Sequence, residues 1–118
     1  MFNIISAKSF IRRERIKKAK NILFTKRAMC KYINKKLKNV DTSYHNEIRF
    51  NIDDFTFKYN ILLKDTEVKT LFETYLIPKL EKKGYIVSKA DNQYMSLLYH
   101  IKWRNIWCWI KLKKLKNI

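Results

Sequence analysis

Three side chains in the middle of the chain are of the types that a metal-dependent nuclease uses. Asp54, Glu67 and Lys69 form a D…E-x-K series, in which two carboxylates bind a divalent metal and an ammonium group lies near the reacting water. Nucleases of this kind carry these groups on adjacent strands, whereas we expect Glu67 and Lys69 in the first turn of a helix. Residues two apart on a helix point to different sides. We therefore interpret Glu67 as part of an acidic helix start and predict no catalytic residue.

The histidines, the cysteines and the glycine do not suggest another reactive site. His45 and His100 have no Cys, Asp or Glu cluster near them in the sequence, as a metal site or a nucleophilic triad would need. Cys30 and Cys108 are far apart and adjoin apolar or aromatic residues, so we expect buried thiols in a reducing compartment. Gly84 is the single glycine, and one glycine cannot build a phosphate-binding loop. We expect no enzymatic activity, no metal and no cofactor.

Charge is the strongest signal in the sequence. The chain has 118 residues, with 27 Lys and Arg against 10 Asp and Glu, which gives a net charge of +17. Residues 1–40 carry +12, residues 41–99 carry −1, and residues 100–118 carry +6. A genome rich in A and T would also favour lysine, but it would not predict a neutral centre between charged ends. Such a surface attracts polyanions: nucleic acid, an anionic membrane or an acidic protein.

The length and the apolar content, 47% of the residues, allow one domain with a real core. Within it we distinguish a basic helical segment (1–40), a compact α+β core (41–103) and a basic tail rich in Trp and Lys (104–118). The start of the chain has too short an apolar stretch for a secretory signal peptide. No stretch approaches the 18 or so apolar residues of a membrane-spanning helix.

The first segment is predicted to be helical, with Ser6 as N-cap and no Gly or Pro from Ala7 to Asn39. The apolar pattern changes near Asn21 and Thr25, so one helix, or two over about 7–19 and 21–38, both fit. The apolar residues form a loose first stripe and a cleaner second one: Phe10, Ile16, Ala19 and Leu23, then Ile22, Met29, Ile33 and Leu37.

The rest of the chain predicts a small antiparallel sheet of three or four strands packed against one helix. Short runs with apolar residues at alternate positions indicate the strands: Glu47–Ile52, Phe55–Ile61, Tyr85–Ser88 and Met95–Trp103. Asp53-Asp54 and Ala90–Gln93 are the expected turns. The helix runs from Thr66 to Lys83, is disturbed near Thr74 by Pro78, and ends at Gly84. The tail after Trp103 fits either a strand extension or a basic amphipathic helix.

The basic first segment is the main candidate for binding a polyanion. Its cations cover most of the helix circumference, and Arg and Lys contact phosphates without reading the base sequence. The predicted nucleic-acid or polyanion-binding residues are Lys8, Arg12, Arg13, Arg15, Lys17, Lys18, Lys20, Lys26, Arg27 and Lys31. No helix-turn-helix glycine, zinc-finger spacing or aromatic RNA-binding motif accompanies them. A solvated helix face and docking to an acidic protein are the alternatives.

The tail predicts an assembly or interface site instead. Tryptophan anchors protein interfaces, stacks on bases and prefers membrane interfaces, and it also completes core strands. The predicted interface residues are Trp107, Trp109, Lys111, Lys113 and Lys114.

Three short stretches resemble small α+β proteins encoded by tailed phages. The helix start Ile5-Ser6-Ala7 is one. The stretch Leu80–Val87 has the pattern Leu-x-x-x-Gly-aromatic-x-Val, and Tyr99–Trp103 has the pattern Tyr-x-Ile-x-Trp. The resemblance spans about residues 4–103, and this chain departs from it in its very basic first helix and in the tail after Trp103. It implies a virion-associated or accessory protein, in the virion or the host cytoplasm, and supplies no catalytic residue.

The sequence therefore predicts a non-enzymatic binding protein that lies against nucleic acid or a neighbouring virion subunit. A free accessory protein that binds nucleic acid without sequence preference is one alternative. A peripheral membrane-binding protein is another, which we rank lower.

Overall fold

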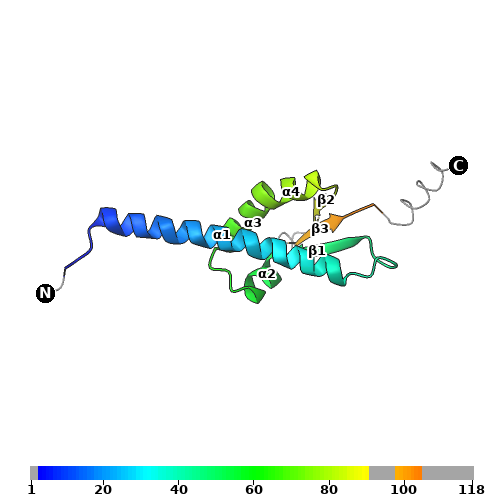
Figure 1. The fold of residues 1–118 in the computed structure, drawn as a ribbon, viewed down its shortest axis with the longest axis horizontal. Helices are drawn as coiled ribbons and strands as arrows, with labels where there is room; N and C mark the ends of the chain where they lie inside the picture. Colours follow the sequence, from blue (N-terminus) through cyan, green and yellow to red (C-terminus); the bar gives the residue numbers. More distant parts are fainter. Residues whose placement is uncertain (1–2, 91–97, 105–118) are drawn as a thin grey trace.

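The computed structural model describes residues 3–90 and 98–104. The fold is α+β, as the sequence predicts: a long N-terminal helix precedes a three-stranded antiparallel sheet with further helices (Figure 1). Most of the predicted turn at Ala90–Gln93 and the predicted interface residues lie outside the described ranges, the latter being Trp107, Trp109, Lys111, Lys113 and Lys114.

The basic first segment forms one helix, α1 (Ala7–Asn39), and not two. Ser6 is its N-cap as predicted, because the Ser6 hydroxyl accepts a hydrogen bond from the Ser9 N–H at 3.2 Å. The absence of Gly and Pro lets the helix continue through Asn21 and Thr25, where the Thr25 hydroxyl donates to the Asn21 carbonyl at 2.7 Å. At 33 residues, α1 is about 50 Å long.

The sheet has the strand order β1-β3-β2, with β1 over Glu47–Asn51, β2 over Ile86–Lys89 and β3 over Leu98–Lys102. Three of the four predicted strands are therefore present, the last one within the described part of its predicted range. The central strand β3 is antiparallel to both neighbours, and Ile101 lies opposite Ile48 on one side and Val87 on the other. The outer strands β1 and β2 are the edges of this sheet.

The predicted strand over Phe55–Ile61 is wrong, because its first four residues form the second half of a helix, α2 (Ile52–Lys58). Its alternating aromatics imitate a strand, yet Phe55 is fully buried while Phe57 is 86% exposed. The Asn51 side chain caps the helix by accepting from the N–H groups of Asp53 and Asp54 at 2.9 and 3.3 Å. These two aspartates, expected as a turn, instead stabilise the positive end of the helix dipole.

The second helical region is present as predicted, and it contains a π-turn. It consists of α3 (Asp65–Leu71), the π-helical turn η1 (Phe72–Leu76) and α4 (Ile77–Lys82). Pro78 lacks the N–H that would bond to the Thr74 carbonyl, and the wider turn just before it accommodates this loss. Gly84 ends the region with φ +94°, and Tyr85 N–H donates back to the Leu80 carbonyl at 3.1 Å.

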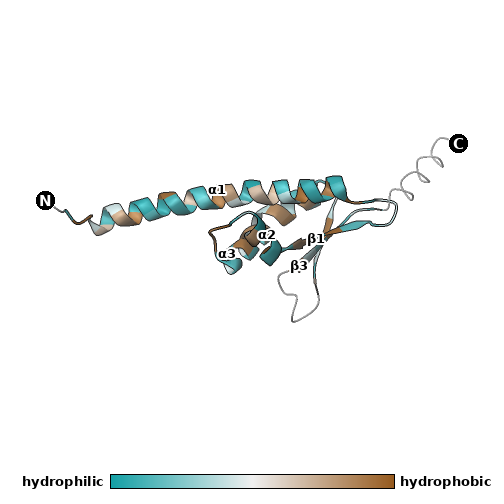
Figure 2. Ribbon diagram, turned by 90° about the horizontal axis from the view of Figure 1, so that it is seen from below, coloured by the Kyte–Doolittle hydropathy of each residue, from teal (hydrophilic) through white to brown (hydrophobic). Residues whose placement is uncertain are grey.

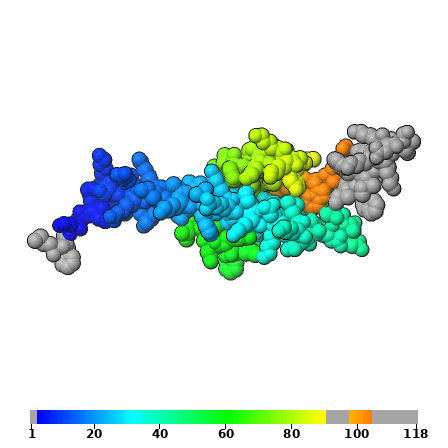
Figure 3. All heavy atoms as spheres, viewed as in Figure 1, coloured from blue at the N-terminus to red at the C-terminus, as the bar shows by residue number. Residues whose placement is uncertain are grey.

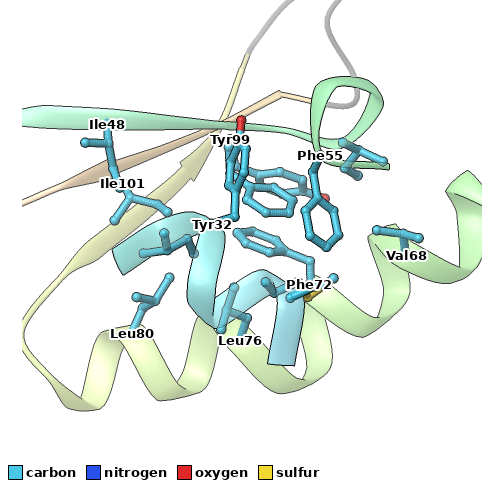
Figure 4. Packing of buried hydrophobic residues seen from close by; sticks show 14 of the residues in the cluster. Tyr32, Ile48, Phe55, Val68, Phe72, Leu76, Leu80, Tyr99 and Ile101 are labelled. Atoms are coloured by element: carbon cyan, nitrogen blue, oxygen red, sulfur yellow. The ribbon is translucent and has the colours of Figure 1, made fainter. Parts of the chain in front are cut away.

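The core lies between one face of the sheet and the helices that cover it (Figure 4). Phe50 of β1 stacks on Phe72 of η1 with ring centroids 4.3 Å apart, and Phe72 meets Tyr99 of β3 at 4.5 Å. Tyr32 of α1 packs edge-on against Phe50 at 5.4 Å. The core thus fixes the second half of α1 to the sheet, while the first half extends beyond it.

Candidate polyanion-binding surface

The first half of α1 stands clear of the domain (Figure 3). We call residues 7–20 the arm, and every one of them is exposed. One side-chain ion pair ties the arm to the domain, since Lys18 Nζ lies 2.9 Å from Glu67 Oε2 at the start of α3. Hydrogen bonding from Lys18 lowers the pKa of Glu67 below its ordinary value. The arm is therefore available along its length and around most of its circumference.

The sheet and the shorter helices all lie on one side of α1 (Figure 2). Exposed cations follow α1 at intervals of four, three, seven, four, four and three residues, at positions between its buried residues. These intervals keep residues on one helix face. We call this set the basic stripe: Arg13, Lys17, Lys20, Arg27, Lys31, Lys35 and Lys38. From Arg13 to Lys38 it extends for about 37 Å along the helix.

Few carboxylates neutralise the cations of the stripe. Glu14 is the single acidic residue of α1, and its carboxylate lies 3.6 Å from Lys17 Nζ. Within residues 3–90 and 98–104, none of the other six stripe cations forms a salt bridge. Their charges are therefore free to meet an external anion.

The ten predicted polyanion-binding residues all lie on α1, in three different settings. Five of them belong to the basic stripe: Arg13, Lys17, Lys20, Arg27 and Lys31. Four others are elsewhere on the arm: Lys8, Arg12, Arg15 and Lys18. Lys26 turns toward the domain, with Nζ 4.6 Å from the centre of the Tyr75 ring. Lys35 and Lys38 were not predicted, although the same three-and-four spacing identifies them.

Apolar side chains lie exposed beside the cations on α1. Phe10, Ile16 and Leu23 of the loose predicted stripe are each about half exposed, as is Phe24. The second predicted stripe does meet the domain, because Met29 and Ile33 are buried, and Ile22 and Leu37 pack against the core. Uncovered apolar residues of the helix thus occur in the arm and just beyond it, at Leu23 and Phe24.

The three residues of the D…E-x-K series do not meet around one point. Asp54 accepts a hydrogen bond from the Tyr32 hydroxyl at 2.7 Å, while Glu67 pairs with Lys18. A neighbouring lysine, Lys89, lowers the pKa of Lys69. In the part of the chain that the structure describes, no group of three His, Cys, Asp or Glu residues is placed to hold a metal ion.

The described cysteine and the two histidines lie in three different settings. Cys30 is half-buried rather than fully buried, with Sγ 4.0 Å from Lys79 Nζ; Cys108 lies outside the described ranges. Lys79 also donates to the Tyr75 hydroxyl at 3.3 Å, which raises the pKa of Lys79. His45 is exposed in the loop before β1. His100 Nδ1 lies 3.5 Å from a carboxylate oxygen of Glu47.

Comparisons with known proteins identify no relative: no family model matches the chain, and neither a curated protein nor a solved structure does. Among the described helices, none is long and apolar enough to cross a membrane.

Proposed function

We propose that the protein is a non-enzymatic binding protein whose helix α1 binds the phosphate backbone of nucleic acid without reading its sequence. The observation that carries this proposal is the basic stripe, a row of seven exposed cations on one face of a single helix. A row of this kind matches a ligand whose own charges are arranged in a row.

Elementary electrostatics supports this pairing. Each Lys or Arg that neutralises a phosphate releases a condensed counterion, so affinity grows with the number of contacts and falls as salt is added. The stripe carries cations at both ends and in the middle of α1. Several phosphates can therefore be bound at once without a pocket for any base.

The anchored half of α1 gives the stripe a fixed direction. Tyr32 and Met29 are buried in the core, and Lys36 Nζ donates to the Arg49 carbonyl of β1 at 2.9 Å. These contacts hold the helix axis against the sheet. A ligand that binds the stripe is thus oriented relative to the domain as well as attracted to it.

The test compares two variants of the full chain that each lose four positive charges. The stripe variant carries Arg13→Gln, Lys20→Gln, Arg27→Gln and Lys31→Gln. The control variant carries Lys64→Gln, Lys82→Gln, Lys83→Gln and Lys89→Gln, all at exposed positions outside α1. Fluorescence anisotropy of a labelled random duplex, at one low salt concentration, gives the dissociation constant of each.

We expect the stripe variant to bind about a hundredfold more weakly than the unmodified chain, and the control variant to lose much less. Equal losses in both variants would show that net charge alone attracts the duplex. No binding of the unmodified chain at low salt would overturn the proposal.

Docking to an acidic protein, such as a neighbouring virion subunit, is the second candidate. The exposed side chains Phe10, Ile16 and Leu23 favour it, because phosphates offer apolar residues nothing to contact. The triple variant Phe10→Ala, Ile16→Ala and Leu23→Ala keeps every cation. It should bind the duplex as the unmodified chain does; a large loss would show that the apolar residues take part in the same surface.

A further inference from the structure

A second basic feature lies at the other end of α1. The last turns of α1, the strand β1 and the end of α2 enclose a cleft of about 450 Å³. A volume of this size suits a small ligand. Four cations line the cleft: Lys35, Lys36, Arg49 and Lys58.

These cations come together through the fold and not through sequence spacing. Lys35 and Lys36 belong to α1, Arg49 to β1, and Lys58 to the last turn of α2. Bringing like charges together costs free energy unless an anion lies between them.

Acidic groups near the cleft offset only part of this charge. Glu47 is the one carboxylate among the lining residues, and its oxygen lies 3.5 Å from His100. Asp54 is not among the lining residues, but its charge raises the pKa of Lys36, and its carboxylate accepts a hydrogen bond from the Tyr32 hydroxyl. Within the described residues, none of the four lining cations forms a salt bridge.

Lys36 is held in a fixed position at the base of the cleft. Its ammonium group donates to the Arg49 carbonyl at 2.9 Å and lies 4.8 Å from the centre of the Tyr32 ring. Burial lowers the pKa of Lys36, Asp54 opposes this effect, and the nearby Lys58 and Arg49 lower the pKa further. A bound anion would offset the repulsion from Lys58 and Arg49.

The edge of the sheet adds a backbone donor. Arg49 lies in β1, an edge strand, and its carbonyl accepts from Lys36 rather than from β3. In an extended strand the N–H and C=O of one residue point to the same edge. The Arg49 N–H therefore faces the same side as the lysine side chains.

We infer that this cleft is a binding site for phosphate groups, which adjoins the basic stripe at Lys35. Phosphate oxygens accept from ammonium, guanidinium and backbone N–H donors together, and several charges on one ligand match several cations on three elements. The group belongs either to a free polyphosphate compound or to a nucleic-acid chain that reaches the cleft past Lys35, the residue that the cleft and the stripe share. This inference does not depend on the proposed role of the stripe.

Titration calorimetry of the full chain with inorganic tripolyphosphate tests the cleft directly. The cleft variant is Arg49→Gln with Lys58→Gln, and the matched control is Lys82→Gln with Lys83→Gln, two exposed cations at the end of α4. If thermal unfolding shows that the cleft variant does not fold, Lys58→Gln alone replaces it, with Lys82→Gln as its control, since both side chains are exposed and neither belongs to the stripe.

We expect the unmodified chain to bind tripolyphosphate at one site, and the cleft variant to bind at least about tenfold more weakly for each lost charge-assisted contact. The matched control should bind tripolyphosphate as the unmodified chain does. The stripe variant, which keeps Lys35, should do the same. No binding, or equal losses in cleft and control variants, would overturn the inference.

Duplex titrations of the same proteins identify the source of the phosphate. A cleft variant that loses duplex affinity beyond its control places a nucleic-acid phosphate in the cleft. If the cleft variant loses affinity for tripolyphosphate but not for the duplex, the site binds a free polyphosphate. If only the stripe variant loses duplex binding, the duplex binds the stripe and not the cleft. The inference about the cleft is then decided by the tripolyphosphate titration.

Discussion

The two halves of α1 share one helix and one charge sign, yet only one half belongs to a core. Residues 7–20 are all exposed, whereas the second half contributes five buried residues: Thr25, Ala28, Met29, Tyr32 and Ile33. An isolated helix of about 14 residues is marginal in water. The first turn of α1 contains no acidic residue to complement the helix dipole. The arm is therefore helical because it continues a helix that the core already holds.

This contrast separates the buried residues that stabilise the fold from the exposed surface offered to a ligand. Substitutions at the buried residues of the anchored half should change the free energy of unfolding. Substitutions in the arm should change local helix content, and substitutions at stripe cations in either half should change binding.

The largest expected difference compares two apolar residues of α1. Met29 is fully buried and Ile16 is 49% exposed. Met29→Ala should lower the free energy of unfolding by about 2–5 kcal/mol, because it leaves a cavity in the core, whereas Ile16→Ala should change it by less than about 0.5 kcal/mol. Urea denaturation followed by circular dichroism measures both. Similar losses would mean that the arm packs on the domain after all.

A hydrogen bond gives the next largest effect. The buried Tyr32 hydroxyl donates to Asp54 at 2.7 Å, so Tyr32→Phe should cost about 1.5–3 kcal/mol, the range for bonds to charged groups. Tyr44, which is 83% exposed, provides the control. Tyr44→Phe should leave the urea midpoint unchanged, and a Tyr32→Phe variant as stable as the unmodified chain would contradict the anchoring role of this pair.

Glycine substitutions should separate local from global stability. Ala19→Gly in the arm costs about 1 kcal/mol of helix propensity, and it should speed amide hydrogen exchange in residues 7–20 without moving the global unfolding midpoint. Ala28→Gly, in the anchored half, should lower that midpoint, because Ala28 is buried. An arm whose exchange did not respond to Ala19→Gly would have stabilising contacts that the structure lacks.

The smallest effect concerns the ion pair between Lys18 and Glu67. The folded-state pKa of Glu67 is lowered, so its contribution is present above the unfolded-state pKa of about 4.3 and is lost as pH falls through the folded pKa. Lys18→Gln should lower the melting temperature slightly at pH 7, and the difference should vanish toward pH 3. Arg15→Gln, at an arm residue with no carboxylate partner among the described residues, should show no such pH dependence.

Local signals predicted the ends of elements better than their type. Ser6 and Gly84 marked helix ends correctly, because capping chemistry depends on neighbouring residues alone. Phe55 and Phe57 alternate as in a strand, but the segment is helical. The Asn51 side chain caps this helix at its N-terminus. Lys35 and Lys38 were missed, although they continue the same three-and-four spacing along the stripe.

The cleft, in contrast, could not be predicted from the sequence. Lys36, Arg49 and Lys58 belong to three elements, and their approach depends on how α1 and α2 pack beside β1. No spacing rule encodes that arrangement. Sites built from one helix are accessible to sequence reasoning, whereas sites assembled across elements require the tertiary structure.

The salt dependence of duplex binding tests the central claim most directly. For the unmodified chain, the logarithm of the association constant should fall linearly with the logarithm of salt concentration, with a slope of about −0.9 for each neutralised phosphate. The stripe variant lacks four cations, so its slope should be shallower by about 3 to 4. The control variant should keep the slope of the unmodified chain. Equal slopes in the unmodified chain and the stripe variant would contradict the assignment of phosphate contacts to α1.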